Sequence, residues 1–367
     1  MISKNDAYRG CLLGLAIGDA MGYPVDTKTW NQIQEDYGPY GLMGYDLLNG
    51  YAEISSHTQI AAFSCNGLLL GQTRGQVYSK MAPFVRYVHL AQQEWAIGQR
   101  RYDQPVRNYN WVFRVSEMRH RHCTDTRMVE TLNRSAPGSL EEPVNRYDTP
   151  ASLSASVAAG MFRTCGKLGM AETDRLGAES VALTHGHPLA FLPGAMVAHL
   201  IGDCLRHNDI PLRPIIKKSL RALQEQFVRE YPREVSQISA LVEQAMSLAE
   251  ERLTQPVTVM ERLKCDTGAE VLAGALYAAL LCEDDFDNAM VVAVNHSGRS
   301  AAVGCLTGAI LGAKMGESEL PDFYLDGLYL ADVLRELADD LVHGCPMERG
   351  NLLFDGDWES KYLHGEY

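Results

Sequence analysis

The chain of 367 residues lacks the features that mark several special classes of protein. Its nine cysteines form no CxxC or CxxH pair, which argues against a zinc finger or a disulfide framework and favours reduced thiols in the cytoplasm. The 33 Lys and Arg residues are fewer than the 46 Asp and Glu residues. The resulting formal net charge of −13 argues against direct binding to nucleic acid or membranes. The apolar runs are interrupted by Gly, Asp or His, so no membrane span is expected, and the N-terminus has no signal-peptide pattern.

Strand-type alternation of Val and Ile with polar residues is also nearly absent, whereas helical patterns recur along the whole chain. No low-complexity linker or internal repeat divides it. We therefore predict an all-α, single-domain helical bundle over residues 1–343, followed by an irregular tail, 344–367, packed on its surface. The expected helices cover residues 6–23, 58–72, 78–98, 151–169, 174–185, 187–206, 213–229, 234–253, 266–282, 285–295, 302–314 and 326–343.

Two of these helices carry glycine at every fourth position, which places the glycines on one face. The first has Gly10, Gly14, Gly18 and Gly22, and the second has Gly304, Gly308 and Gly312. Glycine costs roughly 1 kcal/mol relative to alanine within a helix, so such a face is tolerable where another backbone packs closely against it. We expect both helices in the centre of the bundle.

An insert at about 75–135 differs in character, because residues 99–134 interleave arginines with large aromatic side chains. Such residues often anchor protein interfaces. The candidate partner-binding residues are Arg101, Tyr102, Arg107, Tyr109, Trp111 and Arg114. The alternative is a solvated helix pair whose arginines balance nearby acids such as Glu117 and Asp125.

Several ordered segments resemble the ADP-ribosylglycohydrolase family of the DraG type. The run from Gly10 to Asp26, GCLLGLAIGDAMGYPVD, is similar to the family's first motif, and Thr58-Gln59 follows at the usual distance. Further similar segments are Phe162-Arg163 with Leu168-Gly169, Ala182 to Pro188, Ala275 to Ala278 with Asp285-Phe286, Ala293 to Asn295, and Leu320 to Ala338. The resemblance implies an orthogonal helical bundle with a cleft. In the family, two Mg²⁺ ions beside the distal ribose of ADP-ribose support glycosidic hydrolysis, assisted by a glutamate whose position here is Asp26.

The resemblance also exposes what has been lost. Where the family reads Thr/Ser-Asp-Asp-Thr-Gln, this chain has Ser55, Ser56 and His57 before Thr58-Gln59. Where the family reads Gly-Gly-Asp-x-Asp-Thr/Ser, the liganding positions are Arg299, Ala301 and Ala302. Mg²⁺ requires hard oxygen ligands, chiefly carboxylates, and arginine cannot act as a ligand. We therefore expect no metal and no cofactor, and Asp26, Asp19 and His185 remain as vestigial catalytic candidates.

Several interpretations of Arg299, the histidines and the stretch 156–160 remain open. Arg299 could pair with Asp26 or Asp19, bind a phosphate or carboxylate, or point to solvent. His57, His185, His187 and His296 could form a Zn²⁺ or Ni²⁺ site if they converge; otherwise His185 keeps a structural hydrogen-bonding role. The stretch Ser156 to Gly160 replaces a glycine-rich loop, and its side chains would narrow the approach to a nucleotide.

These patterns predict a catalytically inactive protein that binds a protein partner. The family resemblance suggests a basic ADP-ribosyltransferase toxin, neutralised by an immunity protein that blocks its active site. The alternative is a metal-independent glycosidase that cleaves the N- or O-glycosidic bond of ADP-ribose, with Asp26 as general acid or base and Arg299 stabilising the leaving group. A structural subunit unrelated to ADP-ribose is a third possibility, which no residue specifically favours.

Overall fold

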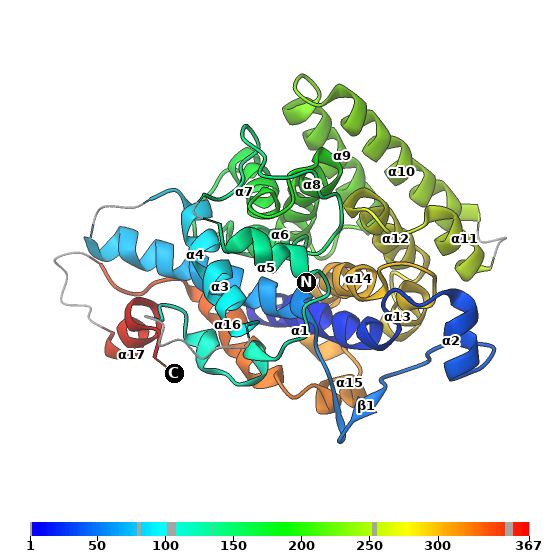
Figure 1. Ribbon diagram of the computed structural model, residues 1–367, viewed down its shortest axis with the longest axis horizontal. Helices are drawn as coiled ribbons and strands as arrows, with labels where there is room; N and C mark the ends of the chain where they lie inside the picture. The colour runs from blue at the N-terminus through cyan, green and yellow to red at the C-terminus, as the bar shows by residue number, and fades with distance from the viewer. Residues whose placement is uncertain are drawn as a thin grey trace.

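The computed structural model describes residues 2–78, 82–100, 108–134, 136–251, 255–348 and 355–366, and within them the fold is all-α, as predicted (Figure 1). The only sheet in these ranges is a two-residue hairpin. The α-helices are α1 (Lys4–Gly22), α2 (Trp30–Tyr37), α3 (Ser56–Tyr78), α4 (Phe84–Gly98), α5 (Thr126–Leu132), α6 (Ala155–Phe162), α7 (Met170–Ala182), α8 (Pro188–Cys204), α9 (Leu212–Phe227), α10 (Pro232–Glu251), α11 (Pro256–Leu263), α12 (Gly268–Leu281), α13 (Phe286–Val294), α14 (Ser300–Met315), α15 (Asp322–Gly327), α16 (Ala331–His343) and α17 (Gly356–Glu359). The strands are β1 (Leu47–Leu48) and β2 (Tyr51–Ala52), and short 3₁₀ turns include η1 (Tyr23–Val25), η2 (Trp111–Arg114), η3 (Glu117–Arg119) and η4 (Glu317–Glu319).

Helices α1 and α14 form the centre of the bundle, and their glycine faces pack against each other. A Cβ atom added to Gly18 would lie 1.9 Å from the carbonyl oxygen of Gly304, and one added to Gly308 would lie 1.9 Å from that of Gly14. These distances are far shorter than any van der Waals contact, so only glycine permits the approach. The prediction from the glycine spacing is confirmed, and the partner of each face is the other helix.

The remaining helices surround this pair (Figure 1). Helix α16 packs against one side of α1, while α13, α12 and α8 pack against α14. Helices α6, α7 and α8 form a further packed group, which α3 and α4 join through α6 and α7. The arrangement brings the C-terminal end of α1 to the N-terminal ends of α3 and α14, where the sequence motifs lie.

The structure differs from the sequence prediction at several elements. Helix α3 continues to Tyr78, and α4 begins at Phe84 rather than at 78. The short helices α2, α5 and α11 and the hairpin were not predicted, since each is too short to show a clear period. The tail carries α17 and a π-helical turn, Ser360–His364, so it is not wholly irregular.

The tail is fixed by specific contacts. Trp358 donates from Nε1 to the Thr73 hydroxyl at 2.9 Å, and Tyr362 is fully buried and donates to Asp340 at 2.5 Å. None of the helices in the described residues combines the length and the apolar character that crossing a membrane requires.

Candidate functional site

The six positions that the resemblance aligns with metal ligands of the family gather where α1, α3 and α14 meet. Ser55 and Ser56 are fully buried, and His57 is 3% exposed at the start of α3. Ala301 and Ala302 are 0% and 2% exposed in the first turn of α14, and Arg299 precedes that helix. The place that the resemblance assigns to two Mg²⁺ ions is therefore lined by hydroxyl, imidazole and methyl groups, with one guanidinium beside it.

Asp19 lies inside this region and is fully buried, but its carboxylate is already saturated. It accepts hydrogen bonds from the backbone N–H of Ser55 at 2.9 Å and of Thr58 at 3.0 Å. It also accepts the hydroxyls of Ser55 at 2.5 Å and Thr58 at 2.6 Å. These donors satisfy the first turn of α3, where backbone N–H groups have no partner within the helix. Asp19 thus anchors α3 to α1 and is not a free acid.

Residues 117–125, which we call the strap, cross over the start of α3. The Ser56 backbone N–H donates to the carbonyl oxygen of His122 at 3.0 Å, and the Ser56 hydroxyl accepts from the Thr124 N–H at 3.1 Å. Gln59 donates from Nε2 to the carbonyl oxygens of Glu117 and His120 at 3.1 and 3.0 Å. The insert therefore contributes the segment that buries the former metal loop, a role that its sequence did not reveal.

Asp26 and Arg299 are both half-buried. The charge of Arg299 acts electrostatically on Asp26, but the two side chains form no direct ion pair. Asp26 accepts the Ala301 N–H at 3.1 Å, while Arg299 Nε donates to the exposed carboxylate of Asp266 at 3.2 Å. Burial raises the pKa of Asp26 to about 6, although the Ala301 N–H and the Arg299 charge act in the opposite direction. The sequence left open a pair of Arg299 with Asp26 or Asp19. In the structure Arg299 pairs with Asp266 instead.

His185 is fully buried in a structural hydrogen-bond network. Its Nε2 contacts the Thr149 hydroxyl at 3.0 Å, and its Nδ1 contacts the Ser152 and Thr184 hydroxyls at 3.0 and 2.9 Å. Burial lowers its pKa, which favours the neutral ring. Asp125, which begins α5 at the end of the strap, lies 3.9 Å away.

The histidines do not assemble a metal site in the described residues, where no group of three or more His, Cys, Asp or Glu side chains is placed to hold an ion. His57 lies within the electrostatic influence of His185 and Arg299, and burial lowers its pKa. His296 is buried elsewhere and contacts the Ala293 carbonyl oxygen through Nε2 at 3.0 Å. His187 caps α8, accepting the Leu189 N–H at Nδ1.

Residues 156–160, which the resemblance aligns with a glycine-rich loop of the family, are part of the core. Ser156 and its successors up to Gly160 are fully buried in α6, and the Ser156 hydroxyl donates to the Leu153 carbonyl oxygen at 2.5 Å. Gly160 faces the backbone of α8, where an added Cβ would lie 2.6 Å from the Ala198 carbonyl oxygen. This segment serves helix packing.

The predicted partner-binding residues have different environments. Arg101, Tyr102 and Arg107 lie outside the described residues. Trp111 is fully buried, so it belongs to the core and is not available as a surface anchor. Tyr109 is half-buried beneath the guanidinium of Arg74, whereas Arg114 is exposed and donates from Nε to the Gly365 carbonyl oxygen at 3.2 Å.

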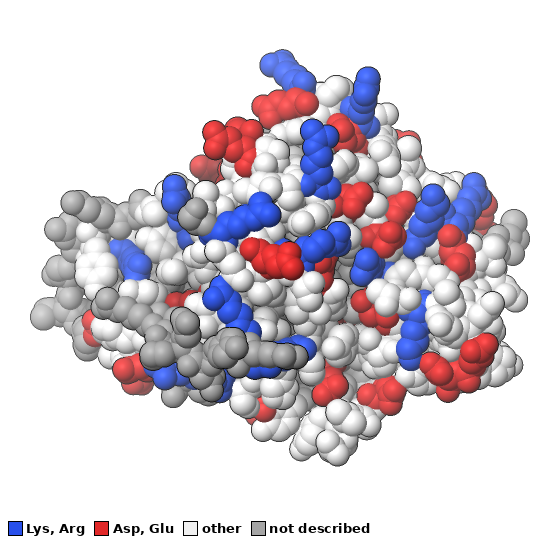
Figure 2. Space-filling view, in the orientation of Figure 1, with Lys and Arg blue, Asp and Glu red and all other residues white. Residues whose placement is uncertain are grey.

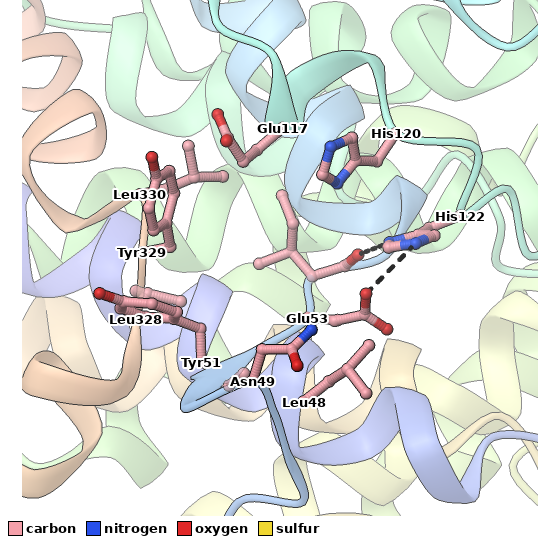
Figure 3. A pocket seen from close by; sticks show the side chains of 12 residues that line it. Leu48, Asn49, Tyr51, Glu53, Glu117, His120, His122, Leu328, Tyr329 and Leu330 are labelled. Carbon is pink, nitrogen blue, oxygen red and sulfur yellow. Dashed lines mark hydrogen bonds and ion pairs between the residues drawn. The ribbon is translucent and has the colours of Figure 1, made fainter.

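A cavity of about 210 Å³ opens on the other side of the strap (Figure 3). The hairpin contributes Leu48 and Tyr51, the segment before α3 contributes Glu53, and the strap contributes Glu117. Leu328, Tyr329 and Leu330 from the α15–α16 connection, with His120 and His122, complete much of the wall. Sequence patterns do not indicate this cavity, because its lining comes from short loops that are distant in the chain.

Two comparisons with known proteins found similarity to this chain. The family model described as ADP-ribosylglycohydrolase matches residues 2–351. A solved structure described as an "ADP-ribosylglycohydrolase-related protein complex" superposes with a TM-score of 0.49 and 18% sequence identity, covering 93% of this chain and 98% of that chain. No curated protein sequence matches.

Proposed function

The chain belongs to the ADP-ribosylglycohydrolase family, and we propose that it is a catalytically inactive member that binds and neutralises a protein partner. The observation that carries this proposal is the replacement and burial of the metal-binding positions. Ser56, His57 and Ala301 supply no carboxylate, and all three are at most 3% exposed.

Magnesium chemistry is poorly supported by such a site. Mg²⁺ keeps near-octahedral oxygen coordination, and two adjacent ions need several carboxylates to offset their charge. The one fully buried carboxylate nearby, Asp19, accepts four hydrogen bonds from Ser55 and Thr58. Any ion that recruited Asp19 would have to disrupt the start of α3, which supports a site without metal.

The partner class we propose is a basic ADP-ribosyltransferase toxin whose active site the chain blocks. The net charge of −13 supports a basic partner, because opposite charges accelerate association and disfavour wrong complexes. The family relationship supports a connection with ADP-ribosylation. The loss of metal ligands supports blocking rather than reversal of the modification.

Calorimetric titration of ADP-ribose into the protein, with and without Mg²⁺, tests the inactive site. We expect no heat in either condition, whereas magnesium-dependent binding would restore the hydrolase interpretation. A second assay mixes the chain with purified basic ADP-ribosyltransferase toxins. We expect stoichiometric inhibition of the transferase, and removal of ADP-ribose by substoichiometric amounts of the chain would contradict the proposal.

Asp26 and Arg299 favour one alternative, a metal-independent hydrolase. A carboxyl group whose pKa is about 6 can donate a proton to a leaving group near neutral pH, and Arg299 lies close enough to influence that pKa. The test is release of ADP-ribose from a modified arginine peptide in EDTA. Activity that Asp26→Asn and Arg299→Ala both abolish would favour this alternative, and no release would exclude it.

A further inference from the structure

The cavity beside the hairpin combines aromatic walls with acidic groups. Tyr51 and Tyr329 meet edge to face, with ring centroids 5.2 Å apart and planes at 85°. Figure 3 shows Glu117 on one side of the cavity and Glu53 on the other, with His120 and His122 facing the tyrosines. Lysine and arginine are absent from the described lining, so its formal charge is negative.

The two carboxylates are available to a ligand. The Glu53 side chain is 41% exposed, and the His122 Nε2 atom lies 3.8 Å from its carboxylate. The Nδ1 atom of the same imidazole contacts the Ile54 carbonyl oxygen at 2.8 Å, which fixes the ring. Glu117 contacts Gln59 through its backbone carbonyl, and no ion pair of its carboxylate is seen among the described residues.

The hairpin and the α15 region, which contribute to the cavity wall, also carry exposed apolar side chains. Leu47, Leu48 and Tyr51 of the hairpin are 49%, 57% and 47% exposed, and Phe323 and Tyr329 of the α15 region are 56% and 57% exposed. In Figure 2 the hairpin region is a white protrusion at the lower edge of the molecule, with acidic side chains on either side. Apolar groups beside a charged pocket are typical of a protein-binding surface.

We propose that this cavity is the docking site for an arginine side chain presented by the basic protein partner, an inference that rests on the proposed function. Arginine fits the lining for two reasons. Its planar guanidinium stacks on aromatic rings, and it forms paired hydrogen bonds with carboxylates. At about 210 Å³ the cavity is smaller than the roughly 300–1,000 Å³ of most small-molecule sites, which favours a single side chain.

These exposed apolar side chains then supply the rest of the interface. Interface hot spots are enriched in arginine and tyrosine and are surrounded by groups that exclude water. A guanidinium between Glu53 and Glu117, shielded by Leu48 and Tyr329, has this arrangement. The net charge of −13 would accelerate association with a basic partner, and the acidic lining of the cavity would then receive its arginine.

The experiment uses methyl NMR of the full chain with labelled leucines, because Leu48, Leu328 and Leu330 line the cavity. The probe is the peptide acetyl-Gly-Arg-Gly-amide, and the control is the same peptide with citrulline, which has nearly the same shape without the charge. We expect the arginine peptide to shift the methyl signals of these three leucines, and to bind with at least tenfold higher affinity than the citrulline peptide. Equal shifts with both peptides, or shifts confined to other leucines, would overturn the proposal.

Variants distinguish the docking site from general charge. Glu53→Gln with Glu117→Gln should abolish the shifts, whereas Glu35→Gln with Glu230→Gln, two exposed acids outside the lining, should preserve them. If both pairs weaken binding equally, the recognition is non-specific and the site is wrong. Inhibition of the toxin is measured on the same variants. If the chain binds the arginine peptide but does not inhibit the toxin, the proposed function alone is contradicted. If inhibition survives Glu53→Gln with Glu117→Gln, the docking site alone is contradicted.

Discussion

The Asp19 carboxylate accepts the Ser55 hydroxyl at 2.5 Å, which ties the end of α1 to the start of α3. This contact gives the Asp19 carboxylate a structural role in the region where the two helices meet. Because Asp19 also accepts two backbone N–H groups of the same turn, its role here is to hold a helix terminus.

Asp19→Ala should therefore lower the free energy of unfolding by about 3 kcal/mol, because it leaves buried donors of Ser55 and Thr58 without an acceptor. Chemical denaturation of the purified variant measures the change. Asp36→Ala removes an exposed ion pair with Lys28 and should cost less than about 1 kcal/mol. Similar effects of the two substitutions would show that the Asp19 contacts contribute little.

Gly308→Ala should prevent the close packing of α1 and α14, since the new methyl group would lie 1.9 Å from the Gly14 carbonyl oxygen. We expect a loss of about 3 kcal/mol or more, or failure to fold, because the clash is with backbone in the core. Gly44→Ala is the matched control, since nothing lies within 4 Å of its added Cβ. Thermal melting followed by circular dichroism compares them, and a stable Gly308→Ala variant would contradict the packing.

Asp26→Asn should stabilise the protein at neutral pH. Burial raises the pKa of Asp26 to about 6 from 3.8, so the folded state holds the proton more tightly than the unfolded state. Wild-type stability should then fall as the pH rises from about 4 to 6, and the variant should gain up to about 3 kcal/mol above that window. Urea denaturation at pH 4 and pH 7.5 measures the difference, and an equal effect at both values would contradict the raised pKa.

His199 gives a pH dependence of the same sign but at higher pH, in a buried cluster away from the candidate site. Burial alone would lower the pKa of His199. Its contacts with Asp174 at 3.0 Å and Asp203 at 3.6 Å outweigh this effect, so the pKa is raised. A raised histidine pKa stabilises the fold below the unfolded value of about 6.5, and this contribution is lost as the pH passes the folded value. His199→Gln should therefore cost about 3 kcal/mol at pH 6 and less at pH 9; denaturation curves showing the same loss at both would refute it.

Magnesium should leave the melting temperature unchanged. A site occupied at one hundred times its dissociation constant would add about 2.7 kcal/mol, but Ser56, His57 and Ala301 provide no carboxylate to form one. Differential scanning fluorimetry with and without millimolar Mg²⁺ is the measurement, and Ca²⁺ serves as the control for non-specific ionic effects. A clear magnesium-specific rise would show that other side chains complete a metal site.

Long, strongly patterned helices could be predicted from the sequence, whereas short elements could not. The glycine spacing in 6–23 and 302–314 predicted two closely packed helices, because glycine at every fourth position destabilises a helix unless another backbone packs against that face. Helices α2, α5 and α11 escaped prediction because about two turns show no reliable period. Trp111 illustrates the same limit, since an aromatic residue among arginines resembles a surface anchor until its burial is known.

The all-α class, the family resemblance and the lack of carboxylates at the positions aligned with the family's metal ligands could all be predicted from the sequence, since they depend on residue identity and local spacing. The four hydrogen bonds that saturate Asp19, the cover of the strap over Ser56 and the bond from Arg299 to Asp266 could not be predicted. The cavity could not be predicted either, because Tyr51 and Tyr329 in its wall are far apart in the chain and meet only in the fold. Hydrogen bonding, burial and pocket shape depend on distances between segments, which local sequence patterns do not encode.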